Sequence, residues 1–312
     1  MIVCVAANPS IDKLFEVERL VPGAIHRPVA FVQTAGGKGL NVARAAHALG
    51  AEVRAAGILR GHAGTWLEEA LEHEGIHGVF VWTEGESRSS LSVANRETPG
   101  LTEFYEHGSV VSPAAWAEFV EGVTSLFEAG RWLTISGSLP RGAPDDGYLD
   151  LVVRAREAGL KVALDTDGER LRRALPGGPD VVKVNAEEVA DSLGVRTGHR
   201  DDWIAAAAKL RELAGGLGHA GIVTWGAEGV MVAAPDGSLY QGALYEQGRY
   251  PVGSGDAFLA GLVVALERGS DWPSALRLAL GTATANAEIL GAGKLEPARA
   301  EELAKRAEVR DA

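Results

Sequence analysis

The chain has 312 residues, of which 46% are hydrophobic and 23% charged, so it has enough apolar residues for one large domain or two modest ones. Its net charge of −12 excludes an extended nucleic-acid or anionic-membrane surface, because such surfaces need clustered lysine and arginine. The single cysteine, Cys4, excludes an internal disulfide and indicates a reducing compartment. With no basic leader and no apolar run of membrane-spanning length, we expect a cytoplasmic protein.

Short β-branched runs alternate with helical patterns along most of the chain. The run "MIVCVAA" opens the chain, the helical pattern "GLNVARAAHALG" comes next, and "EVRAAGIL" follows it. The same alternation returns around "KVALDT", "DVVKVN" and "GIVTWG". Repeated βαβ units of this kind form a mostly parallel sheet with helices on both faces. The sequence therefore predicts an α/β fold.

Two segments, residues 11–34 and 87–107, break this alternation. Both carry period-two patterning around Pro-Gly pairs, which is typical of antiparallel hairpins. We expect them to pair into a small antiparallel β lid over a core built from residues 1–10, 35–86 and 108–312. A sheet so small needs support from the core or from a second copy of itself. Hairpin decoration without a function is the alternative.

Several familiar motifs are misleading or missing. "HEGIH" at residues 73–77 matches a zinc-binding pattern, but Gly75 falls where the helix "LEEALEHEG" should end, so the two histidines would not share a helical face. We therefore expect no zinc site there. The chain has no G-x-x-x-x-G-K-[ST] loop and no G-x-G-x-x-G after its first strand, which argues against P-loop enzymes and dehydrogenases.

A glycine-rich stretch, "TAGGKGLNVARAAHALG" at residues 34–50, precedes a clear amphipathic helix. Glycines allow backbone amides to approach a ligand closely, and a helix N-terminus favours anions. An ordinary loop that enters a helix explains the same letters.

A second glycine-rich turn, in "YPVGSGDAFLAGLVVALERG" at residues 250–269, leads into an apolar helix. Its backbone amides lie at a helix start, where the helix dipole assists an anion hole. Asp256, beside them, is either a reactive carboxylate or a residue that stabilises its own helix terminus.

These pieces occur together in a recognisable order. Asp12, the "GGKG" loop with Asn41, Asn185 with Glu188, "VTWGAEG" and "GSGD" follow one another along the chain. In this respect the whole chain resembles the ribokinase-like PfkB carbohydrate kinases. It looks closest to the branch of tagatose-6-phosphate kinase and 1-phosphofructokinase, which "NPSID", "ESRSSLSV" and "TISGSLPRG" also match. The resemblance implies a ribokinase-like three-layer α/β/α domain.

The resemblance also implies a reaction and residues that perform it. ATP would be the phosphoryl donor and Asp256 the general base, ionised because of the helix dipole, with an anion hole formed by Gly253, Ser254 and Gly255. Mg²⁺ would be held by Asn185 and Glu188, through water if not directly. The residues expected on the nucleotide side are Lys183, Asn185, Thr224, Gly226, Gly229 and Asn286.

For the acceptor, the resemblance implies a set of residues around the lid. They are Asp12, Gly37, Lys38 and Asn41 for the sugar, Arg88 and Arg27 for a phosphate already on it, and Ser136 at a strand end. Solvated lid arginines and an ordinary turn serine remain the alternatives for Arg88, Arg27 and Ser136. Two residues depart from the family pattern: Val184 replaces a commoner proline, and Asp167 puts a carboxylate where a small residue is usual. A carboxylate there would repel an anionic acceptor, so Asp167 either points away from it or indicates a different acceptor.

The resulting hypothesis is a kinase that converts a ketohexose phosphate into a bisphosphate. The candidate acceptors are tagatose 6-phosphate, fructose 1-phosphate and fructose 6-phosphate. A kinase of unphosphorylated sugars or nucleosides, and a sensor without catalytic activity, are the alternatives. The lid's apolar residues also predict a homodimer in which two lids shield each other, with no nucleic-acid or membrane partner.

Overall fold

The main sheet has ten strands in the order β14-β13-β12-β11-β10-β9-β8-β1-β4-β5 in the computed structural model, which describes residues 1–97, 100–246 and 248–312. The strands from β11 to β5 run parallel, and β12, β13 and β14 continue the sheet antiparallel. The strand bounds are β1 Ile2–Ala6, β4 Val53–Arg60, β5 Gly78–Thr83, β8 Trp132–Ser136, β9 Lys161–Asp165, β10 Val181–Asn185, β11 Ala220–Thr224, β12 Val230–Ala233, β13 Leu239–Ala243 and β14 Glu308–Asp311.

The composition of the central strands explains why the sheet needs cover on both faces. In β1 every residue is buried, and successive side chains point to opposite faces. Ile2 and Cys4 belong to the apolar core on one face, whereas Val3 and Val5 belong to the core on the other. The expected α/β fold is confirmed.

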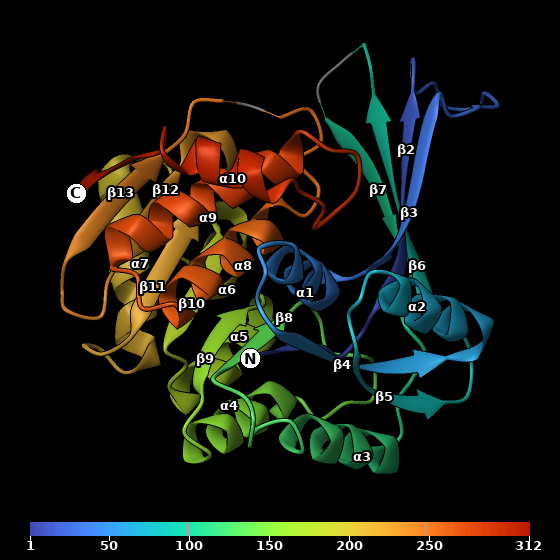
Figure 1. The fold of residues 1–312 in the computed structure, drawn as a ribbon, viewed down its shortest axis with the longest axis horizontal. Helices are drawn as coiled ribbons and strands as arrows, with labels where there is room; N and C mark the ends of the chain where they lie inside the picture. The colour runs from blue at the N-terminus through green and yellow to red at the C-terminus, as the bar shows by residue number, and fades with distance from the viewer. Residues whose placement is uncertain (98–99, 247) are drawn as a thin grey trace.

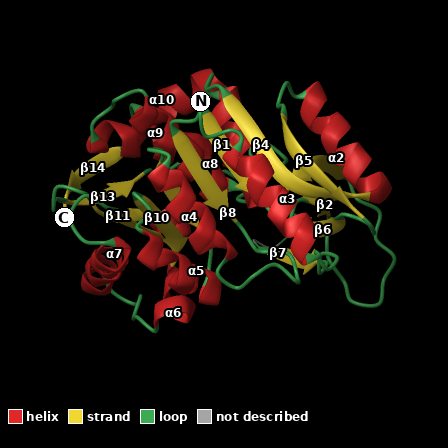
Figure 2. Ribbon diagram, turned by 90° about the horizontal axis from the view of Figure 1, so that it is seen from below, coloured by secondary structure: helices red, strands yellow, loops and turns green. Residues whose placement is uncertain are grey.

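The helices form one layer on each face of the sheet (Figures 1 and 2). One layer contains α1 Lys38–Ala48, α2 Gly61–His73, α8 Ser254–Glu267, α9 Trp272–Ala287 and α10 Pro297–Ala304. The other contains α3 Pro113–Thr124, α4 Gly147–Glu157, α5 Gly168–Ala174, α6 Ala186–Leu193 and α7 Arg200–Ala214. Across the described residues, none of these helices combines the length and the apolarity required to cross a membrane.

The end of α2 determines where the two histidines of "HEGIH" lie. The helix ends at His73, and Gly75 has a φ of 75°, in the left-handed region that favours glycine. His77 lies beyond this turn, just before β5, so the two histidines do not share a helical face. The described residues contain no group of three or more metal-binding side chains.

The lid is a four-stranded sheet that stands apart from the main sheet (Figure 1). Its strands, in the order β3-β2-β6-β7, are β3 Ala30–Gly36, β2 Ser10–Val17, β6 Arg88–Asn95 and β7 Leu101–Tyr105. Each hairpin is antiparallel as expected, but β2 and β6 pair in parallel. Since β2 continues from β1 and β6 from β5, two parallel strands of the main sheet deliver them in the same direction.

Candidate active site

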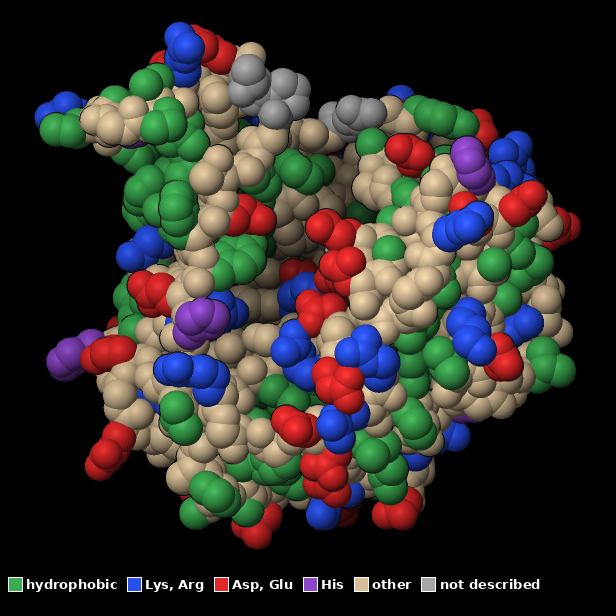
Figure 3. Space-filling model, turned by 180° about the vertical axis from the view of Figure 1, so that it is seen from behind, with side chains coloured by type: hydrophobic (Ala, Val, Ile, Leu, Met, Phe, Trp, Pro, Cys, Tyr) green, Lys and Arg blue, Asp and Glu red, His purple; other side chains and the backbone are tan. Residues whose placement is uncertain are grey.

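A cavity of about 560 Å³ lies between the lid and the main domain, and Figure 3 shows the molecule hollowed at this face. Lid strands form one wall, and the starts of α1 and α8 form the opposite wall. Most of the residues singled out in the sequence line this cavity: Asp12, Gly37, Lys38, Asn41, Arg88, Lys183, Asn185, Glu188, Thr224, Gly226, Gly253, Ser254, Gly255 and Asp256.

Asp12, on β2, is held where the lid meets the start of α1. Its carboxylate accepts hydrogen bonds from the Ser10 hydroxyl at 2.5 Å and from the Gly37 amide at 3.0 Å. A Cβ atom on Gly36 would lie 2.0 Å from this carboxylate, so glycine is required there. Desolvation raises the pKa of Asp12, against the effect of these hydrogen bonds and of the nearby Arg88.

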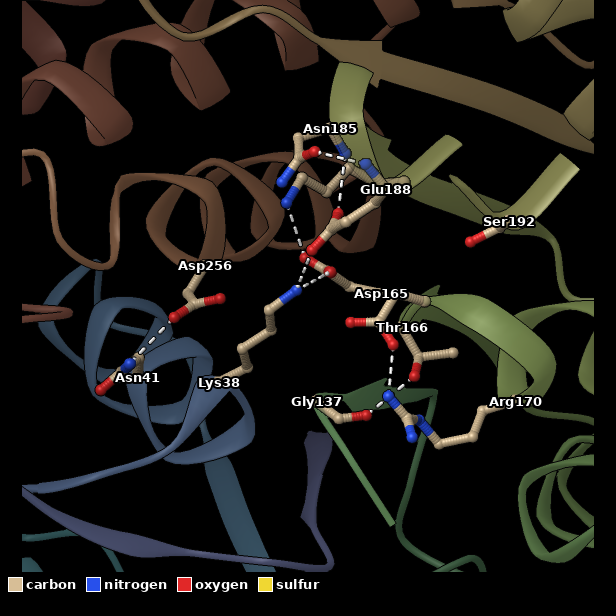
Figure 4. Close-up of polar contacts among 12 residues, drawn as sticks. Lys38, Asn41, Gly137, Asp165, Thr166, Arg170, Asn185, Glu188, Ser192 and Asp256 are labelled. Carbon is tan, nitrogen blue, oxygen red and sulfur yellow. Dashed lines mark hydrogen bonds and ion pairs between the residues drawn. The ribbon is translucent and has the colours of Figure 1, made fainter. Parts of the chain in front are cut away.

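Asn41, on the first turns of α1, is bonded to Asp256 on α8. Its Nδ2 donates to Asp256 Oδ2 at 2.9 Å, and both side chains are buried (Figure 4). The guanidinium of Arg44, one turn later, donates to Asn41 Oδ1 at 3.3 Å and to two backbone carbonyls. Arg44 thus fixes the orientation of the Asn41 amide. Nothing in the sequence indicated this role, because arginines on amphipathic helices are common.

Asp256 lies in the first turn of α8, directly after the glycine-rich turn. Gly253 has a φ of 78°, and a Cβ there would lie 2.7 Å from the Cβ of Ala292, so only glycine fits. The Ser254 amide donates to the Pro251 carbonyl at 3.1 Å. Within the described part of the chain, the amides of Gly253 and Gly255 have no such acceptor. These two remain able to bind an anion.

The ionisation of Asp256 differs from the expectation. The helix dipole should favour the charged form, but burial, with the negative charge of Asp165 added, raises the pKa of Asp256 to about 7. Lys38, Lys183 and the hydrogen bond from Asn41 oppose this rise. Burial outweighs the dipole because only 6% of the residue is exposed. The carboxyl therefore titrates near neutral pH.

Asp165, at the end of β9, is another residue of the candidate site that the sequence analysis did not name. It is completely buried between two ammonium groups, 3.0 Å from Lys38 and 2.7 Å from Lys183. Burial alone would raise the pKa of Asp165, but the two lysines lower it below its ordinary value. An aspartate at the carboxyl end of a buried parallel strand was the available signal.

Lys38 forms ion pairs with two carboxylates at once. Its ammonium lies 2.7 Å from Glu188 as well as 3.0 Å from Asp165 (Figure 4). Burial opposes the charged form, but these carboxylates raise the pKa of Lys38. The lysine is a fixed positive charge in the cavity wall, within the electrostatic reach of Asp256.

Asn185 and Glu188 form a capping box at the start of α6. The Asn185 side chain accepts from the Glu188 amide, and the Glu188 side chain accepts from the Asn185 amide, both at 2.8 Å. Val184, which precedes them, is a regular part of β10 and does not disturb this turn. Both residues line the cavity, and oxygen is the donor that Mg²⁺ prefers. Their three side-chain oxygens already accept from the Glu188 amide, the Asn185 amide and the Lys38 ammonium, and each keeps a further lone pair for a metal or its water. They fit a metal bound mainly through substrate phosphates and water.

A second cavity, of about 320 Å³, opens beside the turn before α8. It shares Thr224, Gly226, Ser254 and Gly255 with the first and is otherwise largely apolar, with Val230, Leu244, Phe258, Leu280 and Ala287 in its walls. Gly229 also lines it and needs to be glycine, because a Cβ would meet the Gly242 carbonyl at 2.3 Å. An apolar slot next to polar turns suits a flat heterocyclic base.

Two of the expected residues, Asn286 and Arg27, line neither these two cavities nor the third one described below. Asn286 is fully buried and holds two loops: its side chain donates to the Val252 carbonyl and accepts from the Gly293 amide. It shapes the turn before Gly253. Arg27 lies exposed in the loop between β2 and β3, and it lines none of the three cavities described for this site.

A third cavity, of about 440 Å³, continues from the first past Gly37, Lys38 and Arg88. We call it the basic cavity, because Lys38, Arg88, Arg141 and Arg170 line it, together with Ser136, Ser138, Asn8, His107, Glu106 and Asp167. The Ser136 hydroxyl is buried there without a hydrogen-bond partner among the described residues. Arg141, in "TISGSLPRG", was not named from the sequence, although its motif was.

Comparison with solved structures shows the same fold elsewhere. The protein is similar to a possible 1-phosphofructokinase from Thermotoga maritima, at 24% identity and a TM-score of 0.90, over 100% of this chain and 99% of that one. It is also similar to phosphofructokinase-2 from Escherichia coli, at 23% identity and a TM-score of 0.87, over 97% and 98% of the two chains.

A match to a family model shows the family as well as the fold. The model described as "pfkB family carbohydrate kinase" matches residues 2–299, nearly the whole chain. The ribokinase-like three-layer fold expected from the motifs is confirmed. The buried carboxylate beside a glycine turn, the oxygen donors and the adjoining cavities form one connected candidate site. The chain belongs to the pfkB family of carbohydrate kinases.

Proposed function

We propose that the protein transfers the γ-phosphoryl group of ATP to a hydroxyl of a ketohexose monophosphate and releases a ketohexose bisphosphate. Tagatose 6-phosphate, fructose 1-phosphate and fructose 6-phosphate are the candidate acceptors. The observation that carries the proposal is the position of Asp256. It lines the first cavity, which continues on one side into the apolar slot and on the other into the basic cavity.

The proposed step begins with an acceptor hydroxyl next to Asp256. The hydroxyl oxygen forms a bond to the γ-phosphorus as its proton passes to the Asp256 carboxylate, and the bond between the γ-phosphorus and the bridging oxygen breaks to release ADP. A base that titrates near neutral pH suits such a transfer, because it is available as carboxylate and still binds a proton readily. The amides of Gly253 and Gly255 stabilise the transferring phosphoryl group.

ATP would lie with its base in the apolar slot and its phosphates toward Gly255 and Lys183. Mg²⁺, held by Asn185 and Glu188 through water or directly, would neutralise phosphate charge. Lys183 keeps its place through Asp165, which binds its ammonium at 2.7 Å. The chain's own contribution is thus a fixed set of charges that need no rearrangement during the reaction.

The acceptor's own phosphate would occupy the basic cavity. Arg88 donates from Nε to the Asn8 carbonyl at 3.2 Å and from Nη1 to the Ser90 hydroxyl at 3.0 Å, and Arg141 donates from Nε to the Gly108 carbonyl at 3.1 Å. These bonds to neutral oxygens hold both guanidinium groups in place while leaving their charge available for a phosphate. Asp12, Gly37, Lys38 and Asn41 then face the sugar between the two phosphates.

An ADP-release assay with Mg-ATP tests the proposal. We expect turnover of at least one of the three ketohexose phosphates, and Arg88→Ala should raise KM for that acceptor by about tenfold to a hundredfold without a similar effect on fructose or ribose. Arg19→Ala is the matched control, because Arg19 is an exposed lid arginine paired with Glu97. Turnover of neutral sugars alone, or an equal loss on both acceptor types, would refute a sugar-phosphate kinase.

We further propose that the protein acts as a homodimer through the lid, in the cytoplasm. Phe31 on β3 and Phe104 on β7 are 55% and 59% exposed. They alternate with Val32 and Tyr105, which line the first cavity, and therefore face the opposite side of the lid. A second lid packed there would bury this apolar surface. It would also give the exposed loop with Arg27 a neighbour.

A further inference from the structure

Asp167 and Arg170 lie on the wall of the basic cavity and form an ion pair with each other. Asp167 immediately precedes α5, Arg170 is on its first turn, and Oδ1 of the aspartate accepts from Nη2 of the arginine. Figure 4 shows Arg170 beside Gly137 and Thr166, at the carboxyl ends of β8 and β9. Both side chains are partly exposed, at 42% and 34%, toward this cavity.

The carboxylate of Asp167 is not needed by its own helix. Asp167 occupies the N-cap position of α5 but makes no side-chain capping hydrogen bond. The Gly168 amide, the first of the helix, donates instead to the Ser192 hydroxyl at 2.7 Å. An N-cap aspartate would ordinarily bind such amides. Its partner here is a guanidinium on a ligand-facing wall.

The pairing changes how much positive charge the basic cavity offers. Among the described residues, four long basic side chains line it. Lys38 is paired with Asp165 and Glu188, and Arg170 is paired with Asp167. Of the described ion pairs, none includes Arg88 or Arg141, although Glu106 and Asp12 act on Arg88 from a greater distance. Two guanidinium groups therefore remain for an anion.

We propose that Asp167 is a specificity-determining residue: by pairing with Arg170, it limits the free positive charge of the basic cavity to Arg88 and Arg141, which match one phosphate dianion. The inference rests on the proposed function, because it concerns the acceptor's phosphate. It explains why a carboxylate is compatible with an anionic acceptor, which the sequence alone made doubtful. The pair presents little net field, whereas either partner alone would present a full charge.

Isothermal titration of the ADP-saturated protein tests the proposal without requiring turnover. The ligands are fructose 6-phosphate, tagatose 6-phosphate, inorganic phosphate and, as the uncharged reference, fructose. Asp167→Asn frees the charge of Arg170, so the phosphorylated ligands should bind about threefold to tenfold more tightly, and less so at high salt. Arg170→Gln should weaken their binding by a similar factor, and fructose should be little affected in both.

The double variant Asp167→Asn/Arg170→Gln removes both charges and should bind within about twofold of the wild type. Glu169→Gln is the matched control: Glu169 is on the same helix and pairs with Arg172 and Arg173, but it does not line the cavity. Its affinities should equal those of the wild type. Asp167→Ser replaces Asp167→Asn should the latter fail to fold.

The outcomes separate this inference from the proposed function. Tighter phosphate binding by Asp167→Asn without turnover of any ketohexose phosphate would support the inference and refute the proposed function. Normal turnover with unchanged affinities in Asp167→Asn, or with an equal change for fructose, would refute the inference alone and leave a purely structural ion pair. Absence of phosphate binding in every variant would overturn both.

Discussion

Asn41 and Asp256, which are 215 positions apart in the sequence, are joined by a hydrogen bond of 2.9 Å. Asn41 lies on the first turn of the helix that follows the lid's first hairpin, and Asp256 lies on the first turn of the helix that follows the glycine-rich turn. The bond orients the carboxylate at the junction of the cavities proposed for acceptor and nucleotide. The proposed base is thus positioned by both halves of the site.

Asp256→Asn should lower kcat by about 10²-fold to 10⁴-fold, because the amide cannot accept the hydroxyl proton. The same change should stabilise the fold at pH 8. Burial of the carboxylate is unfavourable there, whereas a neutral amide still accepts the bond from Asn41. Thermal unfolding at pH 8 and an ADP-release assay measure the two effects. A variant that is less active because it is less stable would contradict the proposed role.

The pH dependence follows from the raised pKa of Asp256. The base must be ionised, so kcat/KM should rise with pH and level off above about 7. Stability should change in the opposite sense: the folded state holds this proton more tightly than the unfolded state, so its contribution is lost as pH rises from about 4 through 7. Rate profiles and urea titrations of wild type and Asp256→Asn isolate both effects, since the variant lacks the group.

Asp165→Asn should be strongly destabilising. It leaves Lys183, itself buried, without its carboxylate, and loss of one partner from a buried ion pair costs about 3–5 kcal/mol. It also removes a negative charge that helps to raise the pKa of Asp256, so the rate profile of any folded fraction should move to lower pH. Asp150→Asn, which breaks an exposed pair with Arg154 on α4, should cost less than about 1 kcal/mol.

The lid surface predicts a dimer that one charge can disrupt. Phe31→Glu puts a carboxylate on the exposed face of β3, so light scattering at micromolar concentration should show a dimer for the wild type and a monomer for the variant. Gln33→Glu is a matched control on the same strand and face, nearer the main domain. A monomeric wild type would contradict the proposed assembly.

The parts of this molecule that could be predicted from the sequence are those that local chemistry specifies. The turn at Gly253 needs a positive φ, which glycine readily adopts, so the sequence predicts a turn there. The fully apolar β1 needs a covering layer on each face, so the sequence also predicts a buried strand. The expectation that the helix dipole keeps Asp256 ionised was wrong. The dipole is a local property, whereas the burial and the charge of Asp165 that raise the pKa of Asp256 come from the tertiary fold.

The contacts of Lys38 illustrate the same limit. Its carboxylate partners, Asp165 and Glu188, are 127 and 150 positions away, and no local pattern announces them. Asp167 looked unsuited to an anionic acceptor until its pairing with Arg170 was visible. Asn286 matched a motif of the nucleotide side, but in the fold its side chain bonds to the backbone of two loops, at Val252 and Gly293.

The parallel pairing of β2 with β6 restricts how the lid can move. The sheet is joined to the main domain at four places, where β1 leads into β2, β3 into α1, β5 into β6 and β7 toward α3. The pairing register puts all four connections at the same end of the lid. The eight paired positions of β2 and β6 bind the halves into one body. A body whose connections all lie at one end can tilt about that end, and the opposite end of its strands then travels farthest. The lid therefore moves as a single lever and not as two independent hairpins.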